Sequence, residues 1–284
     1  MRFSLRLSCL LAPAATLALL TVSAEAHEYW LSPTRFAAHR GDTVSVAARV
    51  GVGYRGDFKP YAAARTTRLE VRTNKVSDVR ALALNGGEEY ARFVLPDDGG
   101  ATVAFESNFA DIQLPAAEFE AYLKLEGLDG PLRARAATGA AGPGRERYAR
   151  CCRAWIAGSD AARATTPVGM TLELLPARDP SKGGNVAFRV ALRGHPLAGA
   201  RVRMWTRPLA ADGGPRTGAQ RDSLGPVFEA RSDAQGLVTA PLHRPGEWLL
   251  TCVHMEPSTD TAEADWQSFW TSYAFAIRTT RRSK

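Results

Sequence analysis

The sequence predicts a mainly β protein with two β-sandwich domains, of the immunoglobulin-like or transthyretin-like kind, joined by a short two-helix connector. Segments in which apolar and polar residues alternate, such as residues 43–50, occur in both halves of the chain, and this period of two is typical of half-buried strands. Clusters of turn-forming residues, such as Asn85-Gly86-Gly87, separate these segments. Because 45% of the residues are hydrophobic and 23% are charged, each half can bury a core.

The first 26 residues are typical of a signal peptide. Arg2 and Arg6 supply positive charge, residues 7–22 form an uncharged apolar stretch, and Ala24 and Ala26 form a small-residue cleavage site. The apolar stretch contains Pro13 and is shorter than the roughly 20 residues that span a bilayer. We therefore expect cleavage after Ala26 and a periplasmic or secreted product without a membrane span.

Residues 27–112 are expected to form the N-terminal β-sandwich. Several short alternating segments are separated by turn residues at the spacing of a sandwich. These predicted strands are residues 43–50, 68–72, 79–84, 90–95 and 102–106.

Residues 113–160 are expected to form the helical connector. Pro115 opens a segment with apolar residues at helical spacing, and Gly127 closes it. A second helix is expected after Pro143 and Gly144, because three large side chains then recur on one helical face: Tyr148, Cys152 and Trp155.

Residues 167–280 are expected to form the C-terminal, transthyretin-like sandwich. Its predicted strands are residues 170–175, 186–192, 201–206, 227–231, 237–240, 247–254 and 266–278. The last strand alternates strongly, with Trp266, Ser268, Trp270 and Ser272 on one face and Phe269, Thr271, Tyr273 and Phe275 on the other.

Charge and cysteine content restrict the partners. The formal net charge is +7, but the arginines are scattered along the chain and form no cluster of the kind that binds nucleic acid. Cys151, Cys152 and Cys252 remain after processing. Adjacent cysteines rarely pair with each other, so a bridge from either one to Cys252 stays open.

Common catalytic motifs are missing from the sequence. It contains no Gly-x-Ser-x-Gly elbow, Walker A loop or His-Glu-x-x-His segment. This favours a non-enzymatic protein but leaves the question of an enzyme open.

Cleavage after Ala26 makes His27 the first residue. Its free α-amine and imidazole Nδ1 can then close a chelate ring on a metal ion. Nitrogen chelates of this kind suit Cu(II) and Ni(II). We therefore expect His27 to be a ligand of a divalent transition metal.

Several motifs together resemble a bacterial family of exported proteins that is catalogued as a domain of unknown function and labelled NikM-like, a periplasmic component of nickel or cobalt uptake. The motifs are residues 26–31, 119–123, 126–128, 145–148, 196–202, 232–236, 253–255 and 265–266. The resemblance implies an N-terminal histidine exposed by processing, a two-part β-rich fold and a role with nickel or cobalt. Residues 194–236 separately resemble a transthyretin-like or carboxypeptidase-regulatory sandwich.

His254 is the expected second metal ligand, because it ends a predicted strand, where side chains reach site-forming loops, and because it lies in a family motif. Asp265 is expected to complete or orient the site, with Met255 and Glu256 as weaker candidates. Three other histidines are assigned to turns or hairpins: His39, His195 and His243.

These observations predict a periplasmic metal-binding protein that delivers Ni, Co or Cu to an uptake or storage partner, such as a membrane metal transporter. Two alternatives remain. One is a copper-dependent oxidoreductase with an N-terminal histidine chelate, in which Tyr29 or Tyr273 lies near an axial position. The other is an adhesion or scaffold module in which His27 is incidental.

Overall fold

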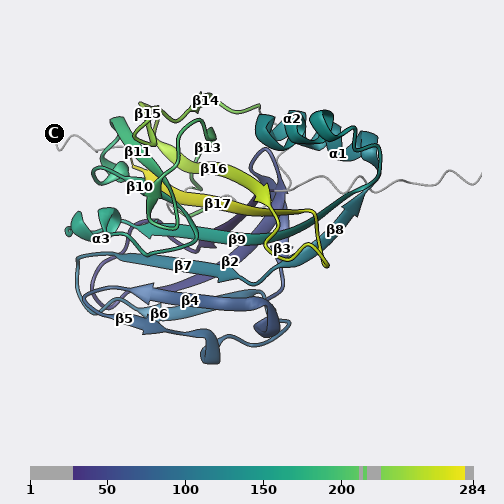
Figure 1. Cartoon of the computed structure of the whole chain (residues 1–284). Coiled ribbons are helices and arrows are strands. Elements are labelled where there is room, and N and C mark those ends of the chain that lie inside the picture. Colours follow the sequence, from purple (N-terminus) through teal and green to yellow (C-terminus); the bar gives the residue numbers. More distant parts are fainter. Residues whose placement is uncertain (1–27, 211–213, 216–224, 279–284) are drawn as a thin grey trace, which may run out of the picture.

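The protein is mainly β, with three sheets stacked in layers (Figure 1). The computed structural model describes residues 28–210, 214–215 and 225–278. A nine-stranded sheet forms the middle layer, and a four-stranded sheet lies on each of its faces. The predicted mainly β class, consistent with β-sandwiches, is confirmed.

The central sheet combines strands from both halves of the chain. Its order is β14-β13-β16-β17-β9-β7-β4-β5, and β8 also pairs with β9. The strands are β4 (Thr66–Arg72), β5 (Val76–Asp78), β7 (Ala101–Ser107), β8 (Ala110–Leu114), β9 (Gly144–Ile156), β13 (Arg201–Arg207), β14 (Phe228–Arg231), β16 (Gly246–Pro257) and β17 (Trp266–Ile277).

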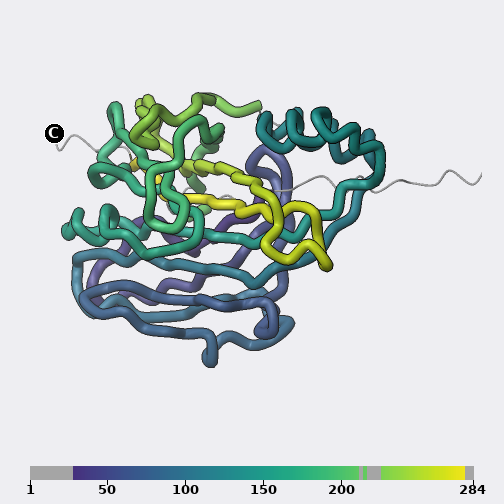
Figure 2. The backbone as a smooth tube through the Cα atoms, in the orientation of Figure 1, coloured from purple at the N-terminus to yellow at the C-terminus, as the bar shows by residue number. Residues whose placement is uncertain are grey.

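The two halves meet where β9 and β17 pair in parallel, from Trp266 opposite Glu146 to Ala274 opposite Ala154. Figure 2 shows the yellow β17 running beside the teal β9, although the two segments are far apart in sequence. Each predicted sandwich therefore has one outer sheet of its own and shares the middle layer.

The two faces of the central sheet are defined by β17. Alternation puts Trp266 and Trp270 on what we call the first face, and Phe269 and Tyr273 on the second face. This division agrees with the alternation predicted from the sequence. The first face packs against the outer sheet formed by β1 (Glu28–Pro33), β2 (Thr43–Val52), β3 (Arg55–Lys59) and β6 (Glu89–Val94).

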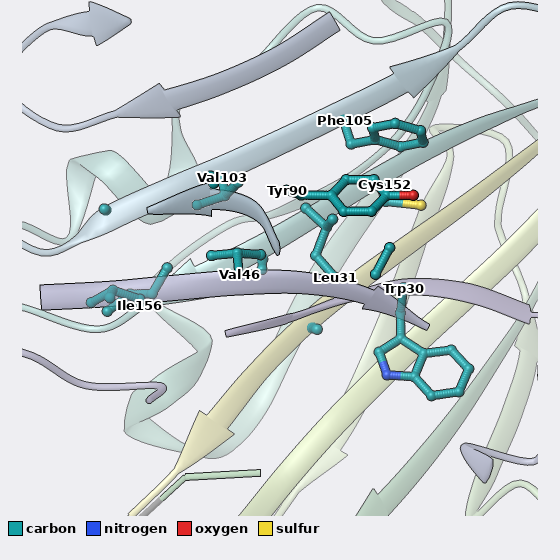
Figure 3. Close-up of a cluster of buried hydrophobic side chains, with 14 of the residues drawn as sticks. Trp30, Leu31, Val46, Tyr90, Val103, Phe105, Cys152 and Ile156 are labelled. Atoms are coloured by element: carbon teal, nitrogen blue, oxygen red, sulfur yellow. The ribbon is translucent and has the colours of Figure 1, made fainter. Parts of the chain in front are cut away.

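The core on the first face contains the side chains of β1. Figure 3 shows Leu31 lying near Tyr90 and Phe105, with Trp30 pointing to the other side of the strand. Cys152 of β9 donates a hydrogen bond from Sγ to the carbonyl oxygen of Tyr29, 3.3 Å away. This contact and the burial of Trp30 and Leu31 hold the start of the described chain against the central sheet.

The second face packs against the other outer sheet. That sheet consists of β10 (Leu172–Pro176), β11 (Gly184–Leu192), β12 (His195–Pro196) and β15 (Leu237–Leu242). Phe188, Tyr273 and Phe275 pack together in this second core.

Two helices cover the part of the first face that the outer sheet leaves open, α1 (Ala116–Glu126) and α2 (Asp129–Thr138). Pro115 precedes α1, and Gly127 ends it with a left-handed φ of 67°. The predicted first helix is thus confirmed. The short elements are α3 (Ala162–Thr165) and the 3-10 turns η1 (Ala63–Arg65), η2 (Arg80–Leu82) and η3 (Pro180–Lys182).

Two predicted elements are wrong. Residues 144–156 form strand β9 and not a helix, and the second helix lies earlier, at Asp129–Thr138. Residues 79–84, predicted as a strand, contain the turn η2 instead. No helix in the described part of the chain is long and apolar enough to cross a bilayer.

The three cysteines of the described chain are free and buried: Cys151, Cys152 and Cys252. Cys151 belongs to the second core and Cys152 to the first, so the neighbours point to opposite faces of β9. The possible bridge to Cys252 is therefore not formed in this structure.

Candidate functional site

The predicted metal ligand His27 lies outside the described residues, as do the predicted signal peptide and its cleavage site. The described chain begins one residue later, at Glu28, which is also the first residue of β1. The surroundings of Glu28 are therefore the part of the predicted site that can be described.

His254 lies on β16, on the second face of the central sheet. Trp248, Leu250 and Cys252 of the same strand belong to the second core, and alternation puts His254 on their side. Its side chain is 26% exposed, and Nε2 lies 3.8 Å from Oε2 of Glu256. Burial lowers the pKa of His254, and Glu256 opposes this shift, so the imidazole is held in the neutral form that can bind a metal.

The two predicted carboxylates are held by arginines. Asp265 lies 2.7 Å from Arg145 and Glu256 lies 2.5 Å from Arg193, measured between side-chain oxygen and nitrogen. The arginine partner in each pair lowers the carboxyl pKa. Both carboxylates are thus neutralised by cations already in the protein.

Met255 is buried on the opposite side of β16 from His254, among the side chains beneath the helices. The structure brings His254 close to Glu256 but does not bring it to the face on which Glu28 lies. Among the described residues, no group of three or more His, Cys, Asp or Glu side chains is arranged to hold a metal ion.

Sequence reasoning did not identify an acidic cluster that the structure forms on the first face. We define it as Glu28 at the start of β1, Glu126 at the end of α1 and Glu146 near the start of β9. All three side chains are buried. Arg203 of β13 interacts electrostatically with Glu28 and Glu126, and Arg150 of β9 with Glu126 and Glu146.

Glu28 is the least satisfied member of the acidic cluster. It is 4% exposed, and its Oε2 atom is buried without a hydrogen-bond partner among the described residues. Burial raises the pKa of Glu28, and the opposing effects of Arg203 and of hydrogen bonds from the backbone N–H groups of Glu28 and Gly53 do not cancel this shift. A carboxyl group buried in this state is either protonated or paired with a cation.

Glu126 forms an ion pair with Arg203, in which Nη2 donates to Oε2. Burial nevertheless raises the pKa of Glu126, against the effect of this pair. Arg203 thus interacts with two carboxyl groups. It forms a hydrogen-bonded ion pair with Glu126 and interacts electrostatically with Glu28.

Glu146 is bonded to neutral groups. Its Oε1 accepts hydrogen bonds from the hydroxyls of Tyr122, at 3.1 Å, and Ser268. Burial raises the pKa of Glu146 to about 7. The guanidinium of Arg150 lies over the rings of Tyr148 and Trp270, 4.9 and 4.8 Å from their centres.

The acidic cluster brings three carboxyl groups together with Arg150 and Arg203. One carboxyl oxygen there, Oε2 of Glu28, has no hydrogen-bond partner among the described residues. A signal was present in the sequence, since the charged residues 146 and 150 interrupt an otherwise apolar set of alternate positions, residues 148, 152, 154 and 156.

The two tyrosines considered for a copper site are both engaged in packing. The Tyr29 hydroxyl lies 2.5 Å from the hydroxyl of Tyr90 and the Tyr29 ring stacks on Phe105. Tyr273 is fully buried in the second core, on the opposite face from Glu28.

Comparison with known protein families matches residues 24–256 to a family described as Domain of unknown function (DUF4198). A search of curated proteins found no match. The matched segment includes β1, both long helices and most of the central sheet. Because this match covers well over half of the sequence, the chain belongs to the DUF4198 family.

Proposed function

We propose that the protein binds a divalent transition metal ion, Ni(II), Co(II) or Cu(II), through the first residue of the processed chain and delivers it to an uptake or storage partner. The metal-binding nitrogens are the α-amine and imidazole of His27, made available by cleavage after Ala26. The observation that carries this proposal is made at the very next residue, Glu28, whose Oε2 atom is buried without a hydrogen-bond partner among the described residues.

Proton affinities are compatible with metal binding near neutral pH. The unperturbed pKa of an α-amine is about 7.7–8.0 and that of a histidine about 6.5. Both nitrogens must lose their protons to become ligands, so metal binding releases protons. An ionised carboxylate next to these nitrogens favours the bound cation.

The position of the proposed site, at the start of strand β1, also supports metal binding. β1 is fixed to the central sheet by the burial of Trp30 and by the bond from Cys152 to Tyr29. A chelate attached directly to Glu28 is therefore anchored at a rigid strand end. The family match begins at Ala24, so the family domain includes the expected first residues of the mature chain.

The transport role rests on the NikM-like resemblance. In this proposal the protein works in the periplasm after export, and its partner is a membrane metal transporter or a storage protein. Neither role requires the protein itself to catalyse a reaction.

Isothermal titration with Ni(II) and Cu(II) tests the proposal. The protein beginning at His27 is expected to bind one ion per chain, and His27→Ala is expected to bind at least about tenfold more weakly, since even residues behind metal ligands commonly contribute 10-fold to 100-fold in affinity. His243→Ala, which removes an exposed histidine, is the control and should bind like the wild type. Equal affinities of wild type and His27→Ala would overturn the proposal.

A further inference from the structure

We infer that the protein has a binding site, separate from the acidic cluster, for a small organic acid with an apolar body and one carboxylate. The site is a cavity of about 750 Å³. It lies at the end of the central sheet where β9 and β17 both end. The inference does not depend on the proposed metal binding.

All three sheets contribute to the wall of this cavity. Residues 36–39 follow β1 of the first outer sheet, and residues 181–184 lead into β11 of the second outer sheet. The central sheet adds residues 157–159, which follow β9, and residues 276–278 at the end of β17. Because β9 and β17 are parallel, their ends lie side by side, at the opposite end of the sheet from α1 and α2 (Figure 1).

The inner wall of the cavity is apolar. It includes Phe36, Leu242 and Ala276, and each of these side chains is at most 2% exposed. Sites for small organic molecules are typically cavities of about 300–1,000 Å³ with mainly apolar walls and a few polar groups. The size and the inner wall therefore fit a ligand with an apolar body.

The rim of the cavity is basic. Four exposed basic residues lie on it: His39, Lys182, His243 and Arg278. The lining has one acidic residue, Asp98, whose Oδ1 lies 3.3 Å from Nδ1 of His39. A cleft lined mainly by one sign of charge attracts ligands of the opposite sign, so the rim favours an anion.

Arg278 is the rim residue that we assign to the carboxylate. Its guanidinium forms no ion pair with a carboxylate in the described part of the chain, whereas Nζ of Lys182 lies 4.0 Å from Oδ2 of Asp179. A guanidinium has two parallel N–H groups that match the two oxygens of a carboxylate. Binding at Arg278 therefore breaks no ion pair among the described residues.

The balance of charges indicates a ligand with one negative charge. His39 and Lys182 already face the carboxylates of Asp98 and Asp179. Arg278 is then the permanently charged rim residue whose charge is not balanced within the described chain. One surplus positive charge is complementary to a single carboxylate.

Isothermal titration of the metal-free protein with decanoate tests the inference. The wild type is expected to bind one molecule per chain, and Arg278→Gln is expected to bind about fivefold more weakly, the factor for one partly exposed ion pair. Arg189→Gln removes an exposed arginine of β11 outside the cavity, so this matched control should bind like the wild type. Absence of binding, or equal binding by the wild type and Arg278→Gln, would overturn the inference.

Two further probes separate the contributions of the rim and the inner wall. Decanamide keeps the apolar body without the charge and is expected to bind about fivefold more weakly than decanoate. Inorganic phosphate keeps a charge without the apolar body and is expected to bind at least about tenfold more weakly. If either probe binds as tightly as decanoate, the proposed ligand class is wrong.

Methyl NMR spectra of the wild-type protein locate the bound decanoate without any variant. The methyl signals of Leu242 and Ile277, which line the cavity, are expected to shift during the titration. The signals of Leu82 and Leu84, which are exposed elsewhere, should stay in place. Shifts at these two leucines without shifts at Leu242 and Ile277 would contradict the assignment to this cavity.

Discussion

Arg203 on β13 donates a hydrogen bond from Nη2 to Oε2 of Glu126 at the end of α1. The side chains are 14% and 2% exposed, so this ion pair joins the helical layer to the central sheet inside the protein. Arg203, whose charge lowers the pKa of Glu28, is thus bonded to a different carboxyl group. Oε2 of Glu28 stays buried without a hydrogen-bond partner among the described residues.

Replacing Arg203 by Met is expected to destabilise the protein by about 3–5 kcal/mol, because breaking a buried pair leaves a carboxylate without its counter-charge. Urea unfolding of the metal-free protein measures this change. Arg201→Met is the matched control on the same strand, since its pair with Glu229 is more exposed and should contribute about 1 kcal/mol or less. Equal losses in the two variants would show that Arg203 has no special role in the acidic cluster.

Glu146 is expected to make stability depend on pH. Its pKa is raised to about 7 in the folded protein from a reference value of 4.5, so the folded state holds the proton more tightly. The stabilisation is complete below about pH 4.5 and is lost as the pH rises through about 7.

Thermal melting of wild type and Glu146→Gln between pH 4 and 8 checks this expectation. The amide stays neutral and can still accept a bond from Tyr122, so the variant should lack this part of the pH dependence. The midpoint of the wild type minus that of the variant should fall across this range. A constant difference would contradict the assigned pKa.

A second buried ion pair joins β9 to the outer sheet on the second face. Nη1 of Arg153 lies 3.0 Å from Oε1 of Glu173, and the side chains are 1% and 6% exposed. Glu173 also accepts bonds from the backbone N–H groups of Val168 and Gly169. Glu173→Gln should destabilise the protein by about 3 kcal/mol because it leaves the guanidinium buried without its counter-charge.

The double variant Arg153→Met with Glu173→Gln is expected to recover part of that loss, since it removes the unpaired charge and keeps an acceptor for the backbone. Denaturant unfolding of the two single variants and the double variant measures the coupling. Strictly additive losses would contradict a buried charge pair.

The three cysteines are expected to remain unreactive thiols in the folded protein. Burial raises the pKa of Cys152 and of Cys252 to about 12, and it also raises the pKa of Cys151. The thiolate is the reactive form. A chromogenic thiol reagent should label the protein only after unfolding, and then at all three cysteines without a reductant. Fewer thiols in the unfolded protein would reveal a disulfide.

The sequence predicts the strands whose two faces differ clearly. The two faces of β17, residues 266–277, could be predicted because large aromatic side chains alternate between them. The boundaries of α1 could be predicted from the sequence because proline is preferred at the start of a helix and glycine at its end, as at Pro115 and Gly127.

Strand β9 was misassigned for a physical reason. The sequence spacing of Tyr148, Cys152 and Trp155 fits a helix, but in the structure these side chains belong to three different packing clusters. The structure holds Arg150 over an aromatic ring and pairs Arg153 with Glu173. Single-sequence periodicity cannot distinguish a solvated charge from a charge that is buried and paired.

The acidic cluster could not be predicted because it depends on long-range pairing. Glu28, Glu126 and Glu146 lie on three elements, and the parallel pairing of β9 with β17 helps to set their positions. Sequence reasoning points to His254, which ends a predicted strand, and to Asp265, which belongs to the same set of family motifs. Which face His254 occupies is decided by the stacking of the outer sheets, which no local pattern reveals.

Intact-mass spectrometry of the exported protein tests the central claim most directly, because the metal site requires a free α-amine at residue 27. The account predicts a single mass equal to that of residues 27–284. A mass that places the first residue anywhere else would contradict it, since the α-amine would then be absent from His27 and the chelate beside Glu28 could not form.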